Sequence, residues 1–270
     1  MLLMGSFRRT AGDDRIGGLG FACQSLVESE LADGIDFVRI DSTITSIRSR
    51  AWLGRLPAAA WRMTRCLWHL GPGGVTRALC FASHGSSFAE KGVLILAGSL
   101  LGRRMLLFPR SGHLVGQVQR SPIFRRFVQW VLRRSHRVIC QSESWRIYFR
   151  GLVEPEHTDK FIVVENWLPA SSFIAPSASV ARSMSPDRFV VAFFNRIEPE
   201  KGVHDFIDAV VLAHASDPRI TGVIHGDGAA LEDVQKRLAD IPSGCITYGG
   251  WLDGDGKREA LRAADAYLFV

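Results

Sequence analysis

Two cations stand close together at a point in the sequence where phosphate chemistry is expected. Arg196 and Lys201 lie in the segment NRIEPEKGV, between an apolar run that predicts a strand and a pattern that predicts a helix. Ligands of open parallel α/β sheets bind at the carboxyl ends of the strands. A guanidinium and an ammonium beside a helix N-terminus would cradle a diphosphate. The alternative is an exposed polar turn in which Glu198 and Glu200 neutralise the cations.

Glycines follow two further predicted strands. The segment RIGGLG contains Gly17 and Gly18 and opens a predicted helix, and the segment HGDG contains Gly226 and Gly228. Because glycine has no Cβ, its backbone can approach a bound ligand closely, and the free N–H groups of a helix N-terminus attract a phosphate. These glycines are therefore candidate ligand-binding residues, with an ordinary surface loop or turn as the alternative in each case.

Short apolar runs alternate with helical patterns along the chain. In its first part the predicted strands are 2–7, 35–40, 78–83, 104–108, 137–141 and 161–164, and the predicted helices include 19–32, 87–102, 123–134 and 144–151. In its second part the strands are 189–194, 222–225, 245–248 and 266–270, and the helices are 203–215, 230–239 and 257–264. This alternation predicts parallel sheets covered by helices on both faces.

The two parts are separated by a segment rich in Ser, Ala and Pro, which is typical of a linker. We therefore expect an α/β chain of two Rossmann-like, doubly wound domains, at 1–170 and 188–270, joined by a linker at 171–187. The second domain has only four predicted strands and stops inside an apolar run. We expect it to be incomplete.

Composition excludes several classes of protein. Hydrophobic residues make up 47% and charged residues 22% of the 270 residues, which is typical of a packed globular chain. No apolar run reaches the roughly 20 residues of a membrane span. Five scattered cysteines without a CxxC pair argue against a zinc site and against a disulfide framework, and they fit a reducing cytosol.

Positive charge is concentrated in the first part of the chain. Residues 1–170 carry 23 Arg and Lys against 13 Asp and Glu, whereas residues 171–270 carry 10 against 14. Segments 46–70 and 121–137 interleave Arg with Trp and Phe, a pattern typical of amphipathic helices at an anionic membrane surface. Ordinary helices with solvated Arg faces are the alternative. We expect no nucleic-acid partner, because no recognised binding motif accompanies the charge.

Several segments together resemble glycosyltransferase family 4. The segment VVAFFNRIEPEKGVHDFIDAV resembles the family's block of an Arg followed by Glu-Lys-Gly and an amphipathic helix, and VIHGDGAALEDVQKRLAD resembles its Gly-x-Gly turn and helix. Four more segments resemble other motifs of the family and occur in the same order as in the family: RIGGLG, SHRVICQSES, KFIVVENWLPASSF and CITYGGWLDGDGKREALRAADAYLFV. The resemblance covers nearly the whole chain, and the Arg and Glu-Lys-Gly block is its most specific part.

The resemblance implies a GT-B fold, in which two Rossmann-like domains face a cleft. Family members move a sugar from a nucleotide sugar to an acceptor, generally with retention of configuration and without a bound metal or other cofactor. Carried over by position, Arg196 and Lys201 would bind the donor diphosphate and stabilise the leaving nucleotide by their charge.

The resemblance also implies places for the glycines. Gly17 and Gly18 would lie near the phosphates or the acceptor, in an acceptor-side first domain. Gly226 and Gly228 would border the nucleotide in the second domain. With the basic, Trp-containing first domain, this implies a lipid-linked or polysaccharide acceptor. It also implies a cytoplasmic enzyme, peripheral at the inner face of the plasma membrane.

The sequence departs from the family pattern in two places. A His near the transferred sugar is common in the family, and His84 and His113 are both candidates, while Arg110 or Ser111 can also occupy that position. The family's two glutamates, seven residues apart, would follow the last predicted strand. The chain stops before them, so we expect a C-terminally truncated family member that is a poor catalyst, with an exposed apolar edge near Tyr267–Val270.

Two other functions stay open on the sequence. Another GT-B enzyme, such as a nucleotide-sugar epimerase, would share the fold, although the Glu-Lys-Gly block argues against it. A non-catalytic protein that binds nucleotide sugars or acts as a scaffold would fit the missing acidic segment. Dependence on an acceptor separates a transferase from an epimerase, and the absence of any turnover marks the scaffold.

Overall fold

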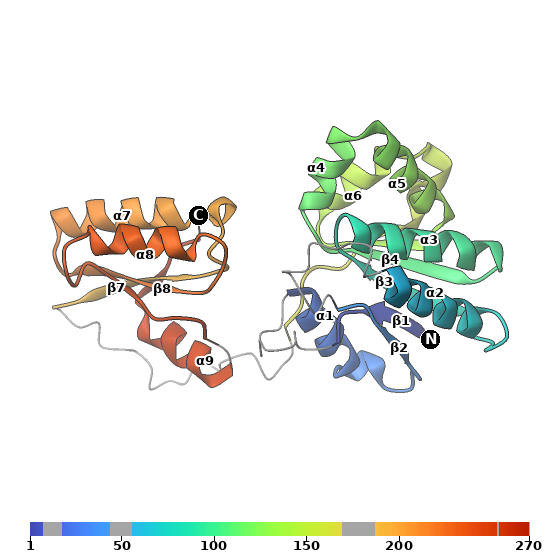
Figure 1. Ribbon diagram of the computed structural model, residues 1–270, viewed down its shortest axis with the longest axis horizontal. Helices are drawn as coiled ribbons and strands as arrows, with labels where there is room; N and C mark the ends of the chain where they lie inside the picture. The colour runs from blue at the N-terminus through green and yellow to red at the C-terminus, as the bar shows by residue number, and fades with distance from the viewer. Residues whose placement is uncertain (8–17, 44–55, 169–186, 253, 270) are drawn as a thin grey trace. The chain divides into compact units, whose positions relative to one another are not determined.

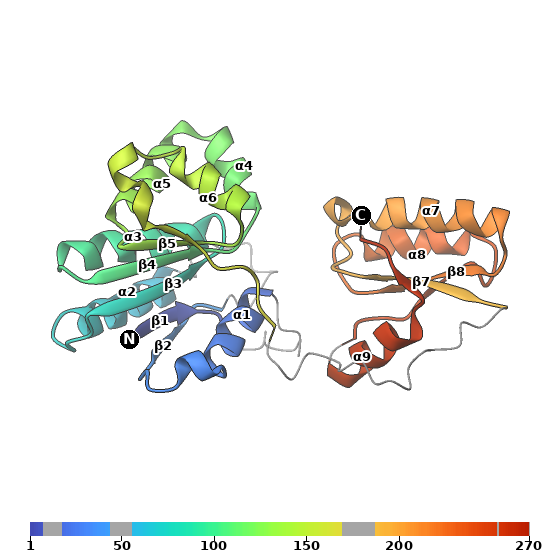
Figure 2. The same cartoon turned by 180° about the vertical axis from the view of Figure 1, so that it is seen from behind.

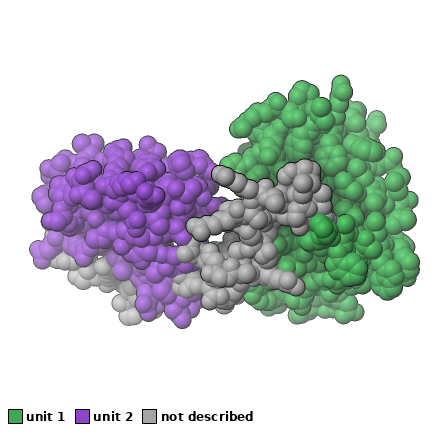
Figure 3. Space-filling model, in the orientation of Figure 1, with its two compact units in different colours: residues 1–174 green, residues 175–270 purple. Residues whose placement is uncertain are grey.

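The computed structural model describes residues 1–7, 18–43, 56–168, 187–252 and 254–269. The chain forms two compact units, Met1–Ile174 and Ala175–Val270, which Figure 3 shows in different colours. The boundary between them falls in a segment outside the described residues. The linker predicted at 171–187 therefore stays a prediction.

Unit 1 is built on a six-stranded sheet in the order β2-β1-β3-β4-β5-β6, and every neighbouring pair is parallel. The strands are β1 Leu2–Gly5, β2 Val38–Asp41, β3 Arg77–Ala82, β4 Arg104–Pro109, β5 Arg137–Cys140 and β6 Phe161–Val163. All six predicted strands are confirmed. The second begins three residues later than predicted, because β2 pairs only with β1 and the register sets Val38 opposite Leu2.

Helices cover both faces of this sheet, as Figures 1 and 2 show. They are α1 Gly18–Val27, α2 Leu56–Leu70, α3 Ser86–Leu100, α4 His113–Arg120, α5 Pro122–Arg134 and α6 Glu143–Arg150, with short 3-10 turns at Glu30–Ala32 and Pro155–Lys160. Side chains alternate along the strands: Leu2 and Met4 join the core under α2 to α6, whereas Leu3 joins the core under α1.

The helix α3 lies at the centre of the helical layer, between α2 and α5. Two of its glycines allow this close packing: a Cβ at Gly98 would collide with the Met105 side chain of β4, and a Cβ at Gly92 would lie 2.6 Å from Phe127 of α5. Phe88 of the same helix is fully buried against the rings of Phe124 and Phe127. The helix is therefore a core element of unit 1.

Unit 2 is built on a four-stranded sheet in the order β10-β7-β8-β9, again with every pair parallel. Its strands are β7 Phe189–Phe194, β8 Ile220–His225, β9 Ile246–Tyr248 and β10 Ala266–Tyr267. Its helices are α7 Val203–Ser216, α8 Leu231–Ala239 and α9 Gly254–Ala263, with a 3-10 turn at Pro199–Lys201. Helices α7 and α8 cover one face over a core that contains Phe193, Phe206 and Ile224, and α9 lies on the other face (Figure 1).

The strand β10 lies at the edge of the sheet in unit 2. Its Tyr267 is 48% exposed, and Phe269 just beyond it is 70% exposed. The exposed apolar edge predicted here is confirmed for these two residues, and Val270 lies outside the described residues. Among the described residues, no helix has the length and apolar character needed to cross a membrane.

Candidate functional site

The loops that follow β7, β8 and β9 meet at the carboxyl edge of the sheet in unit 2. The register sets Phe194 opposite His225 and Ile224 opposite Tyr248, so the three strands end side by side. A cavity of about 210 Å³ opens at this edge. Its lining comes from all three loops and from α9: Phe194, Asn195, Arg196, His225, Gly226, Trp251, Leu252 and Lys257.

Arg196 stands on the wall of this cavity with its side chain 67% exposed. Its Nη2 donates to Glu198 Oε1 at 2.6 Å, and its backbone N–H donates to Asn195 Oδ1 at 2.9 Å. Glu198 is mostly buried, so this ion pair ties the exposed guanidinium to a fixed carboxylate. A guanidinium held in this way can bind an oxyanion.

Lys201 is the last residue of the 3-10 turn in the same loop, and it is exposed to solvent. Gly202 follows with φ +71° and ψ 20°, a left-handed conformation that favours glycine, and it starts α7. The Glu-Lys-Gly block therefore turns the chain sharply from the cavity wall into a helix. The structure places Arg196 in the cavity lining, whereas Lys201 is not among the lining residues.

Gly226 and Gly228 let the loop after β8 pass against the loop after β7. A Cβ on Gly226 would collide with the Asn195 carbonyl oxygen, and Gly226 also has φ +153°. A Cβ on Gly228 would collide with the Ile197 carbonyl oxygen, and the Ile197 N–H donates to Asp227 O at 3.0 Å. Both glycines are thus required for backbone approach, and only Gly226 lines the cavity.

Six of the eight lining residues were not among the sequence candidates, and His225, Trp251 and Lys257 are the ones that add ring or charged groups. The His225 ring stacks on Phe194, with centroids 5.1 Å apart and planes 8° from parallel. Trp251 and Lys257 follow β9, and they add an indole and a further ammonium to the lining. The sequence signal that could have identified Trp251 and Lys257 is an aromatic residue and a Lys soon after a predicted strand, in the segment YGGWLDGDGK.

At the carboxyl edge of unit 1, the structure brings His84 and His113 together. Their rings lie 5.0 Å apart. His84 Nδ1 is 2.9 Å from Ser111 Oγ and 3.1 Å from Ser83 Oγ. The Gly85 N–H donates to Gln117 Oε1 at 2.9 Å, which ties the loop after β3 to α4. The helix α4 was not predicted, and it begins at His113.

The environment of His84 lowers the pKa of its imidazole below the usual value. Partial burial is the larger cause, and the neighbouring His113 is the second. The ring is therefore neutral near pH 7 and can accept a hydrogen bond or a proton there. Gly18 is the exposed first residue of α1, while Gly17 lies outside the described residues.

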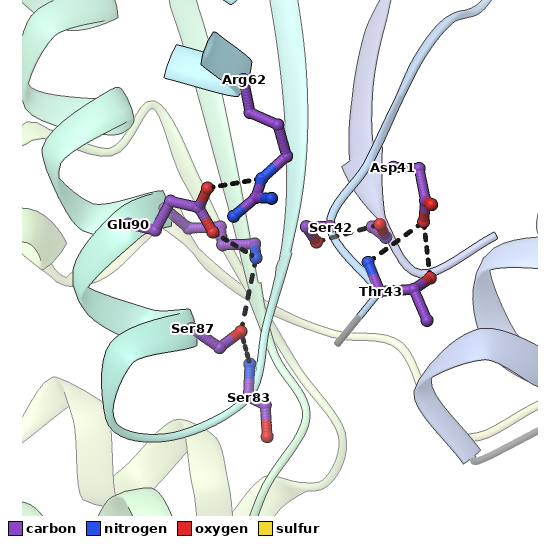
Figure 4. A network of polar contacts seen from close by, with 9 residues as sticks. Asp41, Ser42, Thr43, Arg62, Ser83, Ser87 and Glu90 are labelled. Carbon is purple, nitrogen blue, oxygen red and sulfur yellow. Dashed lines mark hydrogen bonds and ion pairs between the residues drawn. The ribbon is translucent and has the colours of Figure 1, made fainter. Parts of the chain in front are cut away.

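Figure 4 shows two polar networks close to this edge. At the end of β2, the Thr43 N–H and hydroxyl both donate to Asp41 Oδ1, at 3.1 and 2.5 Å. The Phe7 N–H donates to the same oxygen at 3.0 Å, and the Ser42 hydroxyl donates to Gly5 O at 2.9 Å. These bonds fix the ends of β1 and β2 to each other.

The second network joins α2 to the start of α3. Arg62 donates to Glu90 Oε1 at 2.8 Å, and Lys91 Nζ lies 3.3 Å from Glu90 Oε2 and 3.4 Å from Ser87 Oγ. The Ser83 N–H donates to the same Ser87 hydroxyl. Lys91 is only 1% exposed, and its burial lowers the pKa of the ammonium while Glu90 raises it. A buried charge needs such partners, so the network holds the segment before His84 in place.

Comparison with solved structures shows the fold of the chain. Anabaena HepE in complex with UDP and glucose is similar over 92% of this chain and 64% of its own, with 17% identity and a TM-score of 0.60. The catalytic domain of Arabidopsis thaliana starch synthase IV, bound to ADP and acarbose, is similar over 99% and 77%, with 12% identity and a TM-score of 0.64. The lipopolysaccharide outer core galactosyltransferase WaaB is similar over 99% and 73%, with 12% identity and a TM-score of 0.59.

These likenesses show that the two Rossmann-like units form a GT-B fold. The predicted fold class is confirmed. The chain spans less than two thirds of the length of HepE, at 64%. No family model and no curated protein matches the sequence.

A substitution at Gly228 tests the close approach of the two loops. We expect Gly228→Ala to lower the free energy of unfolding of unit 2 by roughly 1–3 kcal/mol, because the methyl group meets backbone that cannot move aside. Chemical denaturation followed by circular dichroism measures this. The control is Gly256→Ala inside α9, where the new Cβ has its nearest neighbour at 3.5 Å. It should be neutral or slightly stabilising. Equal stability of both variants would refute the steric role of Gly228.

The lowered pKa of His84 predicts a pH dependence. The folded chain binds this proton less readily than the unfolded chain, so unit 1 should lose stability as the pH falls below about 6.5. Imidazole proton shifts measured by NMR should show His84 titrating below that value. His113→Gln should raise the pKa of His84 by removing the second cause, whereas His157→Gln should leave it unchanged. A His84 pKa at or above 6.5 in the unmodified chain would contradict this assignment.

Proposed function

We propose that the chain is a glycosyltransferase of the family 4 type that moves a hexose from a nucleotide-sugar donor to a glycan or lipid-linked acceptor. The observation that supports this most directly is the position of Arg196. It lies on the wall of the cavity at the carboxyl edge of β7, β8 and β9, in a chain with a GT-B fold. In sheets of this kind, that edge is where nucleotides bind.

In this proposal, unit 2 binds the donor. The Arg196 fork and the ammonium of Lys201, on one loop before α7, bind the diphosphate and stabilise the charge that builds up on the leaving nucleotide. Such charges can replace a divalent cation, so we propose transfer without a metal and with retention of configuration. Gly226 brings the backbone close to the nucleotide, and Trp251 offers an aromatic face to its base.

Unit 1 binds the acceptor and the transferred sugar. The neutral ring of His84, together with Ser83 and Ser111, presents hydrogen-bonding groups suited to sugar hydroxyls. His113 lies next to this ring and contributes to its neutral state. We propose that these side chains orient the acceptor and the sugar ring for transfer.

Unit 1 also carries a surface suited to an anionic bilayer, which agrees with a cytoplasmic enzyme acting on lipid-linked material. Helices α2, α3 and α5 form one layer, and their outer sides expose three tryptophans: Trp61 at 66%, Trp68 at 57% and Trp130 at 53%. Arg65 and Arg126 are exposed on the same helices. Their one acid is Glu90, which is mostly buried and paired with Arg62 and Lys91.

This combination favours a membrane over a protein partner. Indoles prefer the headgroup level of a bilayer, and each Arg gains from anionic lipid, by roughly 1 kcal/mol. No carboxylate is exposed on the three helices, so no negative side chain on them would repel an anionic lipid surface. The predicted anionic membrane partner is therefore assigned, as a proposal, to the outer sides of α2, α3 and α5.

Calorimetry with a panel of nucleotides and nucleotide sugars tests the donor site. We expect Arg196→Ala and Lys201→Ala each to weaken binding of the preferred nucleotide by about tenfold or more, because each loses a charge-assisted contact of roughly 1.5–3 kcal/mol. Arg219→Ala is the matched control. It removes the same charge from the opposite edge of the sheet, just before β8, and should change the affinity less than twofold. Unchanged affinity in both site variants would exclude the phosphate assignment.

Turnover assays on the same proteins separate the functions that share this fold. Incubation of the preferred nucleotide sugar with and without acceptor distinguishes transfer from epimerisation, since only transfer needs an acceptor. We expect product only when an acceptor is present. Epimerised donor without acceptor, or tight donor binding with no product under either condition, would argue against the transferase.

Flotation with vesicles tests the membrane surface. At low salt the chain should float with vesicles that contain phosphatidylglycerol and should be released by salt, because exposed charges are screened. Exchange of Trp61, Trp68 and Trp130 for Ser should reduce the bound fraction several-fold. Leu212→Ser, which changes a 73% exposed apolar residue of unit 2, should not. No flotation of the unmodified chain at low salt would remove this proposal.

A further inference from the structure

One nitrogen of the Arg110 guanidinium has no partner among the described residues. Arg110 follows β4 at the carboxyl edge of unit 1, and its backbone N–H donates to Ala82 O at 2.7 Å. Its Nη1 atom is buried and has no hydrogen-bond partner in the part of the chain that the structure describes. Among the described residues, no carboxylate forms an ion pair with it. Buried charges in proteins are normally paired, so this nitrogen marks a place for an anion.

Two aromatic rings hold the guanidinium in position. Its Cζ lies 4.9 Å from the centre of the Phe108 ring and 5.4 Å from the centre of the Trp167 ring. The two rings are 5.9 Å apart and tilted by 32°. Trp167 is itself anchored, because its Nε1 donates at 3.0 Å to the hydroxyl of Ser25, a buried residue of α1.

Aromatic faces attract a cation, but they do not accept the hydrogen bonds that the guanidinium N–H groups donate in their own plane. Burial lowers the pKa of Arg110, which shows that its charge is partly desolvated, yet an Arg keeps its proton. The guanidinium is therefore a fixed, charged group whose Nη1 donor lacks an acceptor among the described residues. That is the arrangement of a binding residue for an oxyanion rather than of a structural ion pair.

The neighbours of Arg110 place this anion in the proposed acceptor site. Register pairs Ala82 with Pro109, so the residues that follow β3 and β4 lie side by side. Ser111, the next residue, contacts His84, so a hydroxyl and an imidazole follow Arg110 directly in the same loop and the one beside it. A ligand that bound both would carry sugar-like hydroxyls and a negative group.

We propose that Arg110 binds an oxyanion of the acceptor, a phosphate or a carboxylate, and so selects an anionic acceptor over a neutral glycan. This inference rests on the proposed transferase function, since it assigns the anion to the acceptor. The two sources of negative charge that fit are the phosphate of a lipid-linked acceptor and the carboxylate of an acidic polysaccharide. Either group would accept hydrogen bonds from the same guanidinium.

Indole signals of the intact 270-residue chain test the site and separate it from the donor site. Trp167 touches Arg110, whereas Trp251 lines the cavity of unit 2, so their Nε1–H peaks, assigned with Trp→Phe variants, report on the two sites independently. We expect inorganic phosphate or methyl phosphate to shift the Trp167 peak in a saturable way. Acetate and glucuronate form the second arm, and the stronger class identifies the source.

Variants of Arg110 decide the outcome. Arg110→Met should weaken the phosphate response of Trp167 at least tenfold, and Arg110→Lys, which keeps the charge but not the fork, should weaken it less. Arg150→Gln, an exposed Arg on α6, should leave it unchanged. The thermal midpoint of each variant checks folding. A Trp167 response in Arg110→Met equal to that of the unmodified chain, or no response to any of the four anions, overturns the inference. A UDP or ADP response at Trp251 alone would leave the donor proposal standing and remove only the anion site.

Discussion

Parallel strand pairing is the constraint on which the rest of this structure depends. Every described strand pair in both sheets is parallel, so all strands of a sheet end at the same edge. Each return to the other edge needs a crossover, which the helices supply, and the loops at the carboxyl ends are left free to carry polar groups. Arg196, His84 and Arg110 are each one or two residues beyond a strand, and that is why they lie at the carboxyl edges of the two sheets.

The loops at these edges are held by backbone contacts as much as by side chains. Gly226 and Gly228 have no Cβ to keep the loop after β8 away from Asn195 and Ile197. In unit 1 the hydrogen bonds of Asp41 tie two strand ends together, and the buried Lys91 and Glu90 pair secures the approach to His84. Breaking these contacts is costly where the groups are buried, because a buried polar group is expensive to leave unpaired.

The chemistry of the two units differs in the way that the proposed transfer from a donor to an acceptor requires. Unit 2 offers an exposed Arg beside a small cavity with an aromatic wall, which fits a nucleoside diphosphate. Unit 1 offers a neutral imidazole, hydroxyls and a guanidinium held between rings, which fits a polyhydroxylated anion. The helical layer of unit 1 adds tryptophans and Arg without exposed acids, which fits a surface where a lipid-linked acceptor would be found.

The sequence by itself determined the alternation of strands and helices, because short apolar runs and helical periodicity are local properties. It also placed Arg196, Lys201 and the glycines after strands, which is enough to predict an edge in a parallel sheet. It missed α4, whose eight residues cover little more than two turns and contain only Leu114 and Val118 as buried side chains, so the helical spacing repeats only once. Only the tertiary structure decided which loops meet: His84 with Ser111, Trp251 with Arg196, and Trp167 with Arg110 and Ser25, 142 residues from Trp167 along the chain. Those meetings follow from strand order and register, which arise from packing between distant segments and so cannot be read from any local pattern.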